Sequence, residues 1–483
     1  TPSSQSVAIK RLFLLPLVMF SPLGGADNGS INGKLKAKTV IFLFQKILDN
    51  LERSDWSKFT IERLQPRLSC ETKRGKDQKM KWIAKCVEKG QISRANKCLM
   101  SEHSNVQNAE EVAESIKKMI KSTRKAGCED DERAISNSEL KKDKNISVQT
   151  SFMPKITDLH QTIMSLKCLT SPGINGLRND HLKALWGYSD LDEIDDDVNS
   201  FRKAYYSFIC MMFQPHNETG DLWRLENMVK TVAFLKPNGK IRNIAIEDVN
   251  KKVACTTLFC HIKDVADKML NEVWQVCMSR GGAFKKVAHI DAHEARHPNQ
   301  TKLEVDGDNA FNSACQIKIM ALVKEHFPTA WFFVQNILQT QNLWFFGGED
   351  GIRSFKMKDG ILQGDPMSML LYCISIMPMI KGIDEILKEH NGFTCWYADD
   401  GSVRSDIRQT YEVLEFMNAS SRENGYVINI SKCKIHLQKF DSYQIAMNHK
   451  NRLIQVYGVS CDNVRIHKDN LLSANELYDP SED

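Results

Sequence analysis

The sequence predicts an α+β fold, in which short β-prone runs pair as antiparallel hairpins and amphipathic segments pack on them as helices. Residues 393–396 and 402–403 are β-prone runs that flank a tight turn. Residues 303–305 form a further short strand, and a helix is expected from residue 309 onward. The apolar positions of that helix are Ala310, Ala314, Ile317, Met320 and Ala321. Residues 1–150 carry helical apolar spacing, for example over 87–95 and 109–120.

The most informative residues are the adjacent carboxylates Asp399 and Asp400, which fall in the predicted hairpin turn. Neighbouring carboxylates repel each other and raise each other's pKa unless a cation lies between them. An ordinary surface turn is the alternative, because Asp is common in turns. Asp306 follows the strand at 303–305, so three carboxylates converge if that strand lies beside the hairpin. Such a set is what two-metal nucleotidyl transfer requires.

Four further motifs accompany these two acidic ones. In chain order, the six are Ser171–Arg178, Leu235–Arg242, Asp306–Asn312, Gly360–Ser368, Tyr397–Asp400 and Gly425–Lys432. In this order and spacing, over about residues 150–460, the chain resembles reverse transcriptases, most closely those of non-LTR (LINE-type) retrotransposons. Two positions depart from the family pattern, since Asn243 stands where Pro is usual and Met369 follows Ser368 where Pro is usual. Neither departure removes a charge.

The resemblance implies a right-hand polymerase with fingers and an antiparallel palm sheet packed with helices. It divides the chain into a helical N-terminal extension (1–128), a charged linker (129–150), fingers (151–300), palm (301–440) and a last segment (441–483). The last segment would hold the end of the palm, a primer-grip hairpin at 455–459 and a truncated thumb. Residues 237–239 are a turn signal and would close a fingers hairpin.

The same resemblance assigns roles to the site residues. Asp306 and Asp399 would hold two magnesium ions, with manganese as the alternative, and Asp400 would support them. Lys432 would protonate the leaving pyrophosphate or pair with it, although an ordinary surface lysine remains an equal alternative. The nucleotide would be bound by Lys236, Arg242, Phe311, Gln363 and Gly364.

Phe311 would act as a steric gate, because an aromatic ring under the sugar leaves no room for the 2′-hydroxyl of a ribonucleotide. Viral RNA-copying RNA polymerases usually carry an Asp at this position, so the chain is expected to use dNTPs. The expected activity is RNA-directed DNA polymerisation, with template RNA, a DNA primer or target, and dNTPs as partners. The alternatives are a silent retroelement remnant that only binds nucleic acid, and a group II intron-type reverse transcriptase. The short C-terminal segment motivates the first alternative.

Composition sets broad limits on the function. A net charge of +5 suits nucleic-acid binding without demonstrating it, and 42% hydrophobic residues support a core. The 14 cysteines show no Cys-x-x-Cys spacing, which favours reduced thiols and an intracellular, nuclear or cytoplasmic protein that does not enter a membrane. Residues 293–297 match a His-Glu-x-x-His zinc-protease pattern, but Pro298 follows at once and no third ligand is evident.

Overall fold

The structure is a computed structural model that describes residues 151–471, apart from 169, 188–195, 216–221, 224–225, 236–240, 340–341, 348–350 and 358–359. Before residue 151 it describes only 84, 111–112 and 114–115, all of them helical. The expected helical extension therefore lies almost entirely outside the described residues. The charged linker at 129–150 and the turn at 237–239 lie wholly outside them.

A four-stranded sheet has the strand order β2-β1-β4-β5. Its strands are β1 (Met228–Leu235), β2 (Ile241–Ile246), β4 (Asn342–Gly347) and β5 (Gly351–Lys356). Strands β1 and β2 pair antiparallel up to Leu235 opposite Ile241, so the predicted hairpin at this position is confirmed. Strands β4 and β5 form a second hairpin, and the two hairpins join through the parallel pair β1–β4.

A five-stranded sheet has the order β6-β7-β3-β8-β9. Its strands are β3 (Thr301–Val305), β6 (Phe393–Tyr397), β7 (Asp400–Ser405), β8 (Lys434–His436) and β9 (Val464–Arg465). All neighbours are antiparallel except β8 and β9. The predicted strand at 303–305 and the hairpin around Asp399 are both confirmed, and the strand does lie beside the hairpin.

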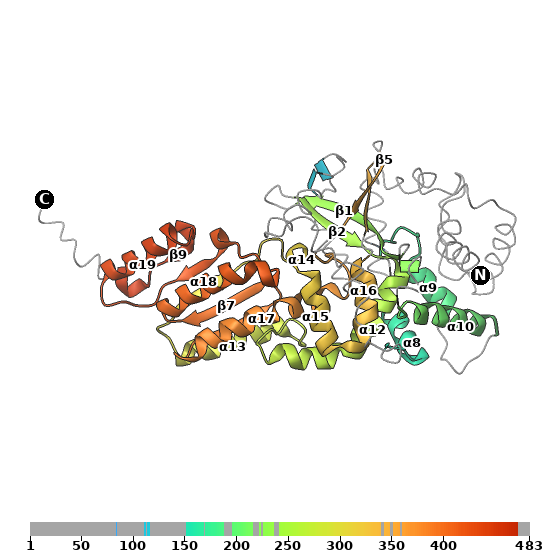
Figure 1. Ribbon diagram of the computed structural model, residues 1–483, viewed down its shortest axis with the longest axis horizontal. Helices are drawn as coiled ribbons and strands as arrows, with labels where there is room; N and C mark the ends of the chain where they lie inside the picture. The colour runs from blue at the N-terminus through green and yellow to red at the C-terminus, as the bar shows by residue number, and fades with distance from the viewer. Residues whose placement is uncertain are drawn as a thin grey trace, which may run out of the picture.

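Helices surround and connect the two sheets (Figure 1). In chain order they are α8 (Ile156–Ser165), α9 (Asn179–Trp186), α10 (Asp196–Met211), α12 (Val249–Asn271), α13 (Gly282–Arg296), α14 (Ala310–Ser313), α15 (Gln316–His326), α16 (Trp331–Gln339), α17 (Ser368–Lys388), α18 (Ile407–Asn424) and α19 (Tyr443–Gln455). Short 3-10 turns lie at Pro328–Ala330, Ile430–Lys432 and Cys461–Asn463. Helix α17 is buried over most of its length and contacts α12, α15, α18 and β6, so it joins the two halves of one hydrophobic core.

The helix predicted from residue 309 onward is interrupted, so the expectation of one continuous helix is wrong. Helix α14 ends at Ser313, and Ala314 has extended backbone angles before α15 begins. The reason is tertiary: the carbonyls of Phe311 and Ala314 accept hydrogen bonds from Ile361 and Gly360, at 2.8 and 3.0 Å. Because a loop distant in sequence supplies these donors, the break in the helix leaves neither of the two carbonyls unpaired.

The primer-grip hairpin predicted at 455–459 is also wrong. Helix α19 runs to Gln455 and ends in an αL motif, in which Gly458 N–H donates to the Ile454 carbonyl (3.2 Å). Val459 N–H donates to the Leu453 carbonyl (3.1 Å). Gly458 has φ +75°, which favours glycine. The glycine therefore terminates a helix, and strand β9 follows it.

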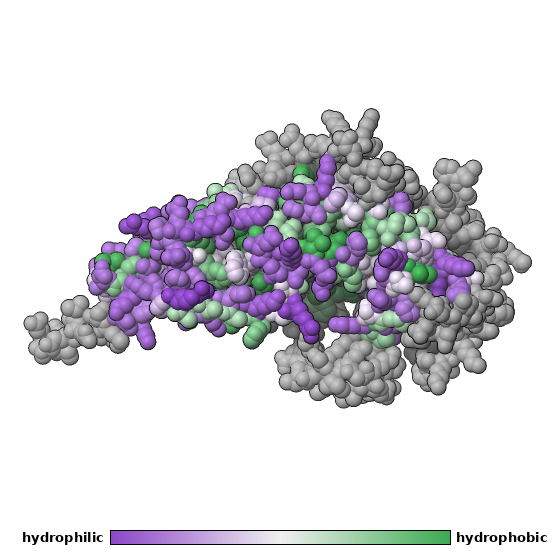
Figure 2. All heavy atoms as spheres, turned by 90° about the horizontal axis from the view of Figure 1, so that it is seen from below, coloured by the Kyte–Doolittle hydropathy of each residue, from purple (hydrophilic) through white to green (hydrophobic). Residues whose placement is uncertain are grey.

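The view of Figure 2 shows a surface that is mainly hydrophilic over the described residues, with scattered apolar patches. The most exposed large apolar side chain among those residues is Phe284 of α13, at 79%. Among the described residues, no helix combines the length and apolar character needed to span a membrane.

Candidate active site

The hairpin between β6 and β7 carries the adjacent carboxylates on a two-residue turn. Tyr397 pairs with Asp400, which leaves Ala398 and Asp399 as the turn residues. Ala398 has φ 53° and Asp399 does not share the positive φ, the pattern of a type II′ turn. Glycine is the usual residue at the first position of such a turn, so Ala398 is held there at a conformational cost.

Two buried side chains hold this turn in place. Gln275 bonds both backbone groups of Ala398: its Nε2 donates to the carbonyl (3.0 Å) and its Oε1 accepts from the N–H (2.9 Å). The hydroxyl of Tyr426 donates to the carbonyl of Asp399 at 3.0 Å. The turn therefore has three side-chain hydrogen bonds to its backbone, which fix where the Asp399 side chain begins.

Strand β3 brings Asp306 to the same edge of the sheet. Val305 is opposite Gly401 in the β3–β7 ladder, and Asp306 follows directly. The Asp306 carbonyl accepts from Asn429 N–H at 2.8 Å. Gly307 lies against the Tyr426 ring, where an added Cβ would be 3.2 Å from a ring carbon. The predicted convergence of the strand end and the turn is thus present in the structure.

The carboxylates at this edge influence one another. Burial raises the pKa of Asp399, and the negative charges of Asp400 and Asp306 raise it further. Lys432, on the 3-10 turn before β8, lies with its Nζ 2.9 Å from Asp306 Oδ2. This hydrogen-bonded ion pair raises the pKa of Lys432. A cation beside these carboxylates is therefore electrostatically favoured, and Lys432 supplies one.

The donor set bears on which metal the site could take. Over the described part of the chain, no group of three or more His, Cys, Asp or Glu side chains has ligand geometry. Asp306 and Asp399 nevertheless place two hard oxygen donors at one edge of the sheet. Their negative charges repel each other, and a cation between them would relieve this repulsion. Carboxylate oxygens are donors that suit magnesium better than a closed zinc site. Asp306 and Asp399 therefore fit magnesium in the type of donor that they offer.

Phe311 lies on α14, which follows Asp306 in the chain, and the 363–364 loop lies against strand β2. Phe311 of α14 is half-buried, and its ring centroid is 5.2 Å from that of Tyr372 on α17. The Gln363 carbonyl accepts from Ala245 N–H of β2 at 3.0 Å. Gly364 has φ +125°, and an added Cβ would lie 2.3 Å from the Ala245 carbonyl oxygen. Only glycine fits at this close approach of loop and strand.

Two expected nucleotide-binding residues cannot be placed as side chains. Lys236 lies outside the described residues, and Arg242 is described in its backbone alone, opposite Phe234 in the β1–β2 ladder. Strand β2, which contains Arg242, is attached to the 363–364 loop through Ala245.

Helix α13 contributes residues that the sequence did not single out for this site. Lys286 Nζ donates to the carbonyl of Asp400 at 2.9 Å, and burial lowers the pKa of Lys286. Gln275, in the segment before α13, is equally unmarked by local sequence. No spacing rule relates these residues to the hairpin, because each acts across more than 100 positions. Tyr426, by contrast, stands inside a recognised motif.

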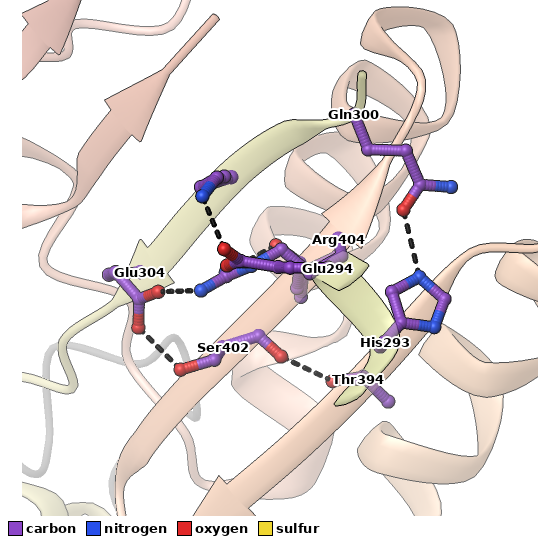
Figure 3. A network of polar contacts seen from close by, with 9 residues as sticks. His293, Glu294, Gln300, Glu304, Thr394, Ser402 and Arg404 are labelled. Carbon is purple, nitrogen blue, oxygen red and sulfur yellow. Dashed lines mark hydrogen bonds and ion pairs between the residues drawn. The ribbon is translucent and has the colours of Figure 1, made fainter. Parts of the chain in front are cut away.

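A network of ion pairs connects α13 to strands β3 and β7 of the five-stranded sheet (Figure 3). Arg404 of β7 reaches Glu294 of α13 through Nε (2.6 Å) and Glu304 of β3 through Nη2 (2.7 Å). Glu304 also accepts from Ser402, and Glu294 accepts from Lys302. These bonds lower the pKa of Glu294 against the opposing effect of burial.

The same network accounts for the zinc-protease pattern. Glu294 is engaged by Arg404 and Lys302, and the His293 ring is 2.8 Å from Gln300 Oε1. Helix α13 ends at Arg296, so His297 lies beyond its last turn. The residues of the pattern act as structural contacts between α13 and the sheet, as Figure 3 shows for His293 and Glu294.

Comparison with known proteins adds an independent observation. No curated protein matches the chain. Similar solved structures include apo telomerase from Candida tropicalis (11% identity, 73% of this chain and 82% of that one, TM-score 0.35). Telomerase from Candida albicans with a TWJ fragment of telomeric RNA is similar over 67% of this chain and 75% of that one (11% identity, TM-score 0.34).

A Candida tropicalis telomerase truncated from the C-terminal domain matches at 12% identity and TM-score 0.33, over 43% of this chain. This chain spans about half (49%) of the length of that protein. The family described as "Reverse transcriptase (RNA-dependent DNA polymerase)" matches residues 234–461. That range contains Asp306, Phe311, Gln363, Asp399 and Lys432, so the converging carboxylates lie within the segment that matches this family.

Proposed function

We propose that this chain is the RNA-directed DNA polymerase of a non-LTR retrotransposon, which adds dNTPs to a primer 3′-hydroxyl opposite a template RNA. The observation that carries the proposal is the placement of Asp306 and Asp399 at one sheet edge, within a reverse transcriptase domain. The five-stranded sheet would be the palm, and the four-stranded sheet with its adjoining helices would belong to the fingers.

Asp306 and Asp399 would hold two magnesium ions, and Asp400 would support them. Magnesium would lower the pKa of the primer hydroxyl and stabilise the charge on the pyrophosphate. In the reaction, the primer 3′-oxygen bonds to the α-phosphorus as the bond to the pyrophosphate oxygen breaks. The hydrogen bonds from Gln275 and Tyr426 would keep Asp399 in place throughout.

The remaining residues would act on the nucleotide. Phe311, braced by Tyr372, would exclude the 2′-hydroxyl, while Gln363 and Gly364 would contact the incoming nucleotide. Lys432, which pairs with Asp306 in the structure, would protonate the leaving pyrophosphate or pair with it. Lys236 and Arg242 would bind the triphosphate oxygens.

The retrotransposon type rests on sequence detail. The run Ala310-Phe311-Asn312 and the motif Gln363–Pro366 favour the LINE type over the group II intron type. Template RNA and a DNA primer or target would be the partners, in keeping with the chain's positive net charge of +5.

The test is incorporation of dTTP on poly(rA) primed with oligo(dT), in magnesium, by the wild type and by Asp399→Asn. We expect incorporation by the wild type, and a loss of about 10³-fold or more in the variant, because an amide neither carries the charge nor matches a carboxylate as a ligand. Asp384→Asn is the matched control, since Asp384 pairs with Lys388 on α17, away from the turn.

Two results would count against the proposal. A wild type that is folded and binds template–primer but incorporates nothing would identify a silent remnant. Equal activity of Asp399→Asn and wild type would remove the metal site from this turn.

A further inference from the structure

A fully buried lysine lies behind the 363–366 loop. Lys251, in the first turn of α12, has a side chain that is 0% exposed. Its Nζ lies 2.9 Å from Glu247 Oε2 and 3.2 Å from Asp365 Oδ2, and these carboxylates are 0% and 2% exposed. Both contacts have ion-pair distances. A buried charge is stable only when it is paired, so Lys251 and its partners depend on one another.

Asp365 connects this lysine to the loop that carries Gln363 and Gly364. Its Oδ1 accepts from Met367 N–H at 2.7 Å, which closes the turn at the start of α17. Its Oδ2 is the oxygen that faces Lys251. The loop therefore has two attachments to the β2–α12 segment: the ion pair at Asp365 and the hydrogen bond between Gln363 and Ala245.

A third segment joins the cluster from the opening motif at 171–178. Asn175 N–H donates to Asp248 Oδ1 at 3.1 Å, and an added Cβ on Gly173 would lie 2.0 Å from the same oxygen. Asp248 is the residue before α12, three positions from Lys251. Two of the motifs that the sequence singled out, at 171–178 and 360–368, thus meet at one buried cluster, although neither of them contains Lys251.

The cluster holds more acidic groups than buried cations. Glu226, Glu247, Asp248 and Asp365 are all buried. Burial raises the pKa of Glu226 and of Glu247 to about 7, and it raises that of Asp248 well above its usual range. Burial acts against the charge of Lys251, but Glu247 and Asp365 more than offset it and raise its pKa. The ammonium therefore stays charged and can hold the loop electrostatically.

We propose that Lys251 is a positioning residue for nucleotide binding: through its buried ion pair with Asp365 it holds the 363–364 loop against β2, in the place from which Gln363 and Gly364 meet the incoming nucleotide. The role in nucleotide binding rests on the proposed polymerase function. The attachment of the loop rests only on the contacts of Lys251, Asp365 and Gln363 described above. Lys251 touches no substrate and acts only through the loop.

Hydrogen exchange tests the attachment without any need for activity. The amides of Ala245 and Met367 donate to Gln363 and Asp365, so their exchange reports whether the loop is held. In Lys251→Met we expect both amides to exchange at least tenfold faster than in the wild type. The matched control is Lys252→Met, one position along the same helix, where exchange should stay as in the wild type. Unchanged exchange at both amides in Lys251→Met would overturn the proposal.

Steady-state kinetics then test the role in nucleotide binding. For Lys251→Met we expect the KM for dTTP to rise about tenfold, with kcat and template–primer affinity changed less than threefold. A variant that is merely less well folded would lose active enzyme, which lowers kcat and leaves KM unchanged. That outcome would reduce Lys251 to a structural role and refute the proposal.

A double variant protects the test against simple misfolding. Asp365→Asn keeps an acceptor for Met367 N–H but removes the charge that Lys251 neutralises. In Lys251→Met/Asp365→Asn no unpaired carboxylate remains at Asp365, so exchange and KM should recover at least threefold toward the wild type. A double variant no better than Lys251→Met would contradict the ion-pair mechanism.

The two hypotheses fail in different ways. If the wild type incorporates no nucleotide, the polymerase proposal fails and the kinetic role of Lys251 fails with it, while hydrogen exchange still decides the attachment of the loop. If the wild type is active and Lys251→Met matches it in exchange and in KM, only the positioning role is lost.

Discussion

Gln275→Leu is the substitution that most directly tests how the acidic turn is held. The Gln275 side chain is fully buried, and its amide bonds both backbone groups of Ala398, which is itself 4% exposed. Leucine fills a similar volume and offers neither a donor nor an acceptor. The Ala398 N–H and carbonyl would then be left unpaired in the interior, at a turn that already holds a non-glycine residue at φ 53°.

The magnitude follows from those two groups. Each buried backbone group left without a partner costs about 1–3 kcal/mol. The added apolar area of leucine returns about 1–2 kcal/mol. At about 2 kcal/mol for each group, the net loss is about 2–3 kcal/mol, a large part of the roughly 5–15 kcal/mol that is typical of a folded domain. At about 2–4 °C per kcal/mol, Tm should fall by roughly 4–12 °C.

The measurements are thermal unfolding followed by circular dichroism, and dTTP incorporation at a temperature where the variant is folded. We expect incorporation to fall more than tenfold, since the Asp399 side chain begins from the loosened turn. Gln444→Leu is the control, because Gln444 is exposed on α19 and its loss should change stability by less than about 0.5 kcal/mol. A Gln275→Leu protein that melts within about 1 °C of the wild type would refute the reasoning.

Two further predictions concern the sugar gate and the buried acidic cluster. Phe311→Val should raise the efficiency of UTP incorporation relative to dTTP about 10–100-fold, measured as the ratio of the two kcat/KM values. The reason is that the variant lacks the ring that would exclude the 2′-hydroxyl. An unchanged ratio would show that Phe311 is not the sugar gate. Glu226→Gln should flatten the pH dependence of stability. Burial raises the pKa of Glu226 from 4.5 to about 7, so the native state retains a proton that the unfolded chain releases, and stability falls as pH rises through that window. Tm of the variant should exceed that of the wild type at pH 8 and match it at pH 4; equal Tm at both values would contradict the raised pKa.

Local pattern was sufficient to predict the elements that bear the acidic residues. The β-prone runs on either side of Asp399 became β6 and β7, and the apolar run before Asp306 became β3. Strand preference and turn chemistry act over a few residues, so a short window contains the information. The reason for the glycine at position 364 is tertiary instead, because Gly364 lies against the distant backbone of Ala245.

Patterns failed where a distant segment changed the outcome. Apolar spacing continues across Ala314, yet the helix breaks there because the 360–361 loop donates to the carbonyls of Phe311 and Ala314. The resemblance predicts a hairpin at 455–459, but helix α19 runs to Gln455 and Gly458 ends that helix. In both cases the local sequence allowed either structure, and the hydrogen-bond partners decided between them.

The sequence by itself identified Asp306, Asp399 and Asp400 as the candidate residues for the chemistry, because they stand in motifs whose order and spacing resemble those of reverse transcriptases. Only the tertiary structure decided what holds them. Gln275, Lys286 and Lys251 bind the turn and the loop from positions more than 100 residues away in the chain. Such contacts follow from how strands and helices pack, and packing brings together residues whose separation in sequence obeys no period.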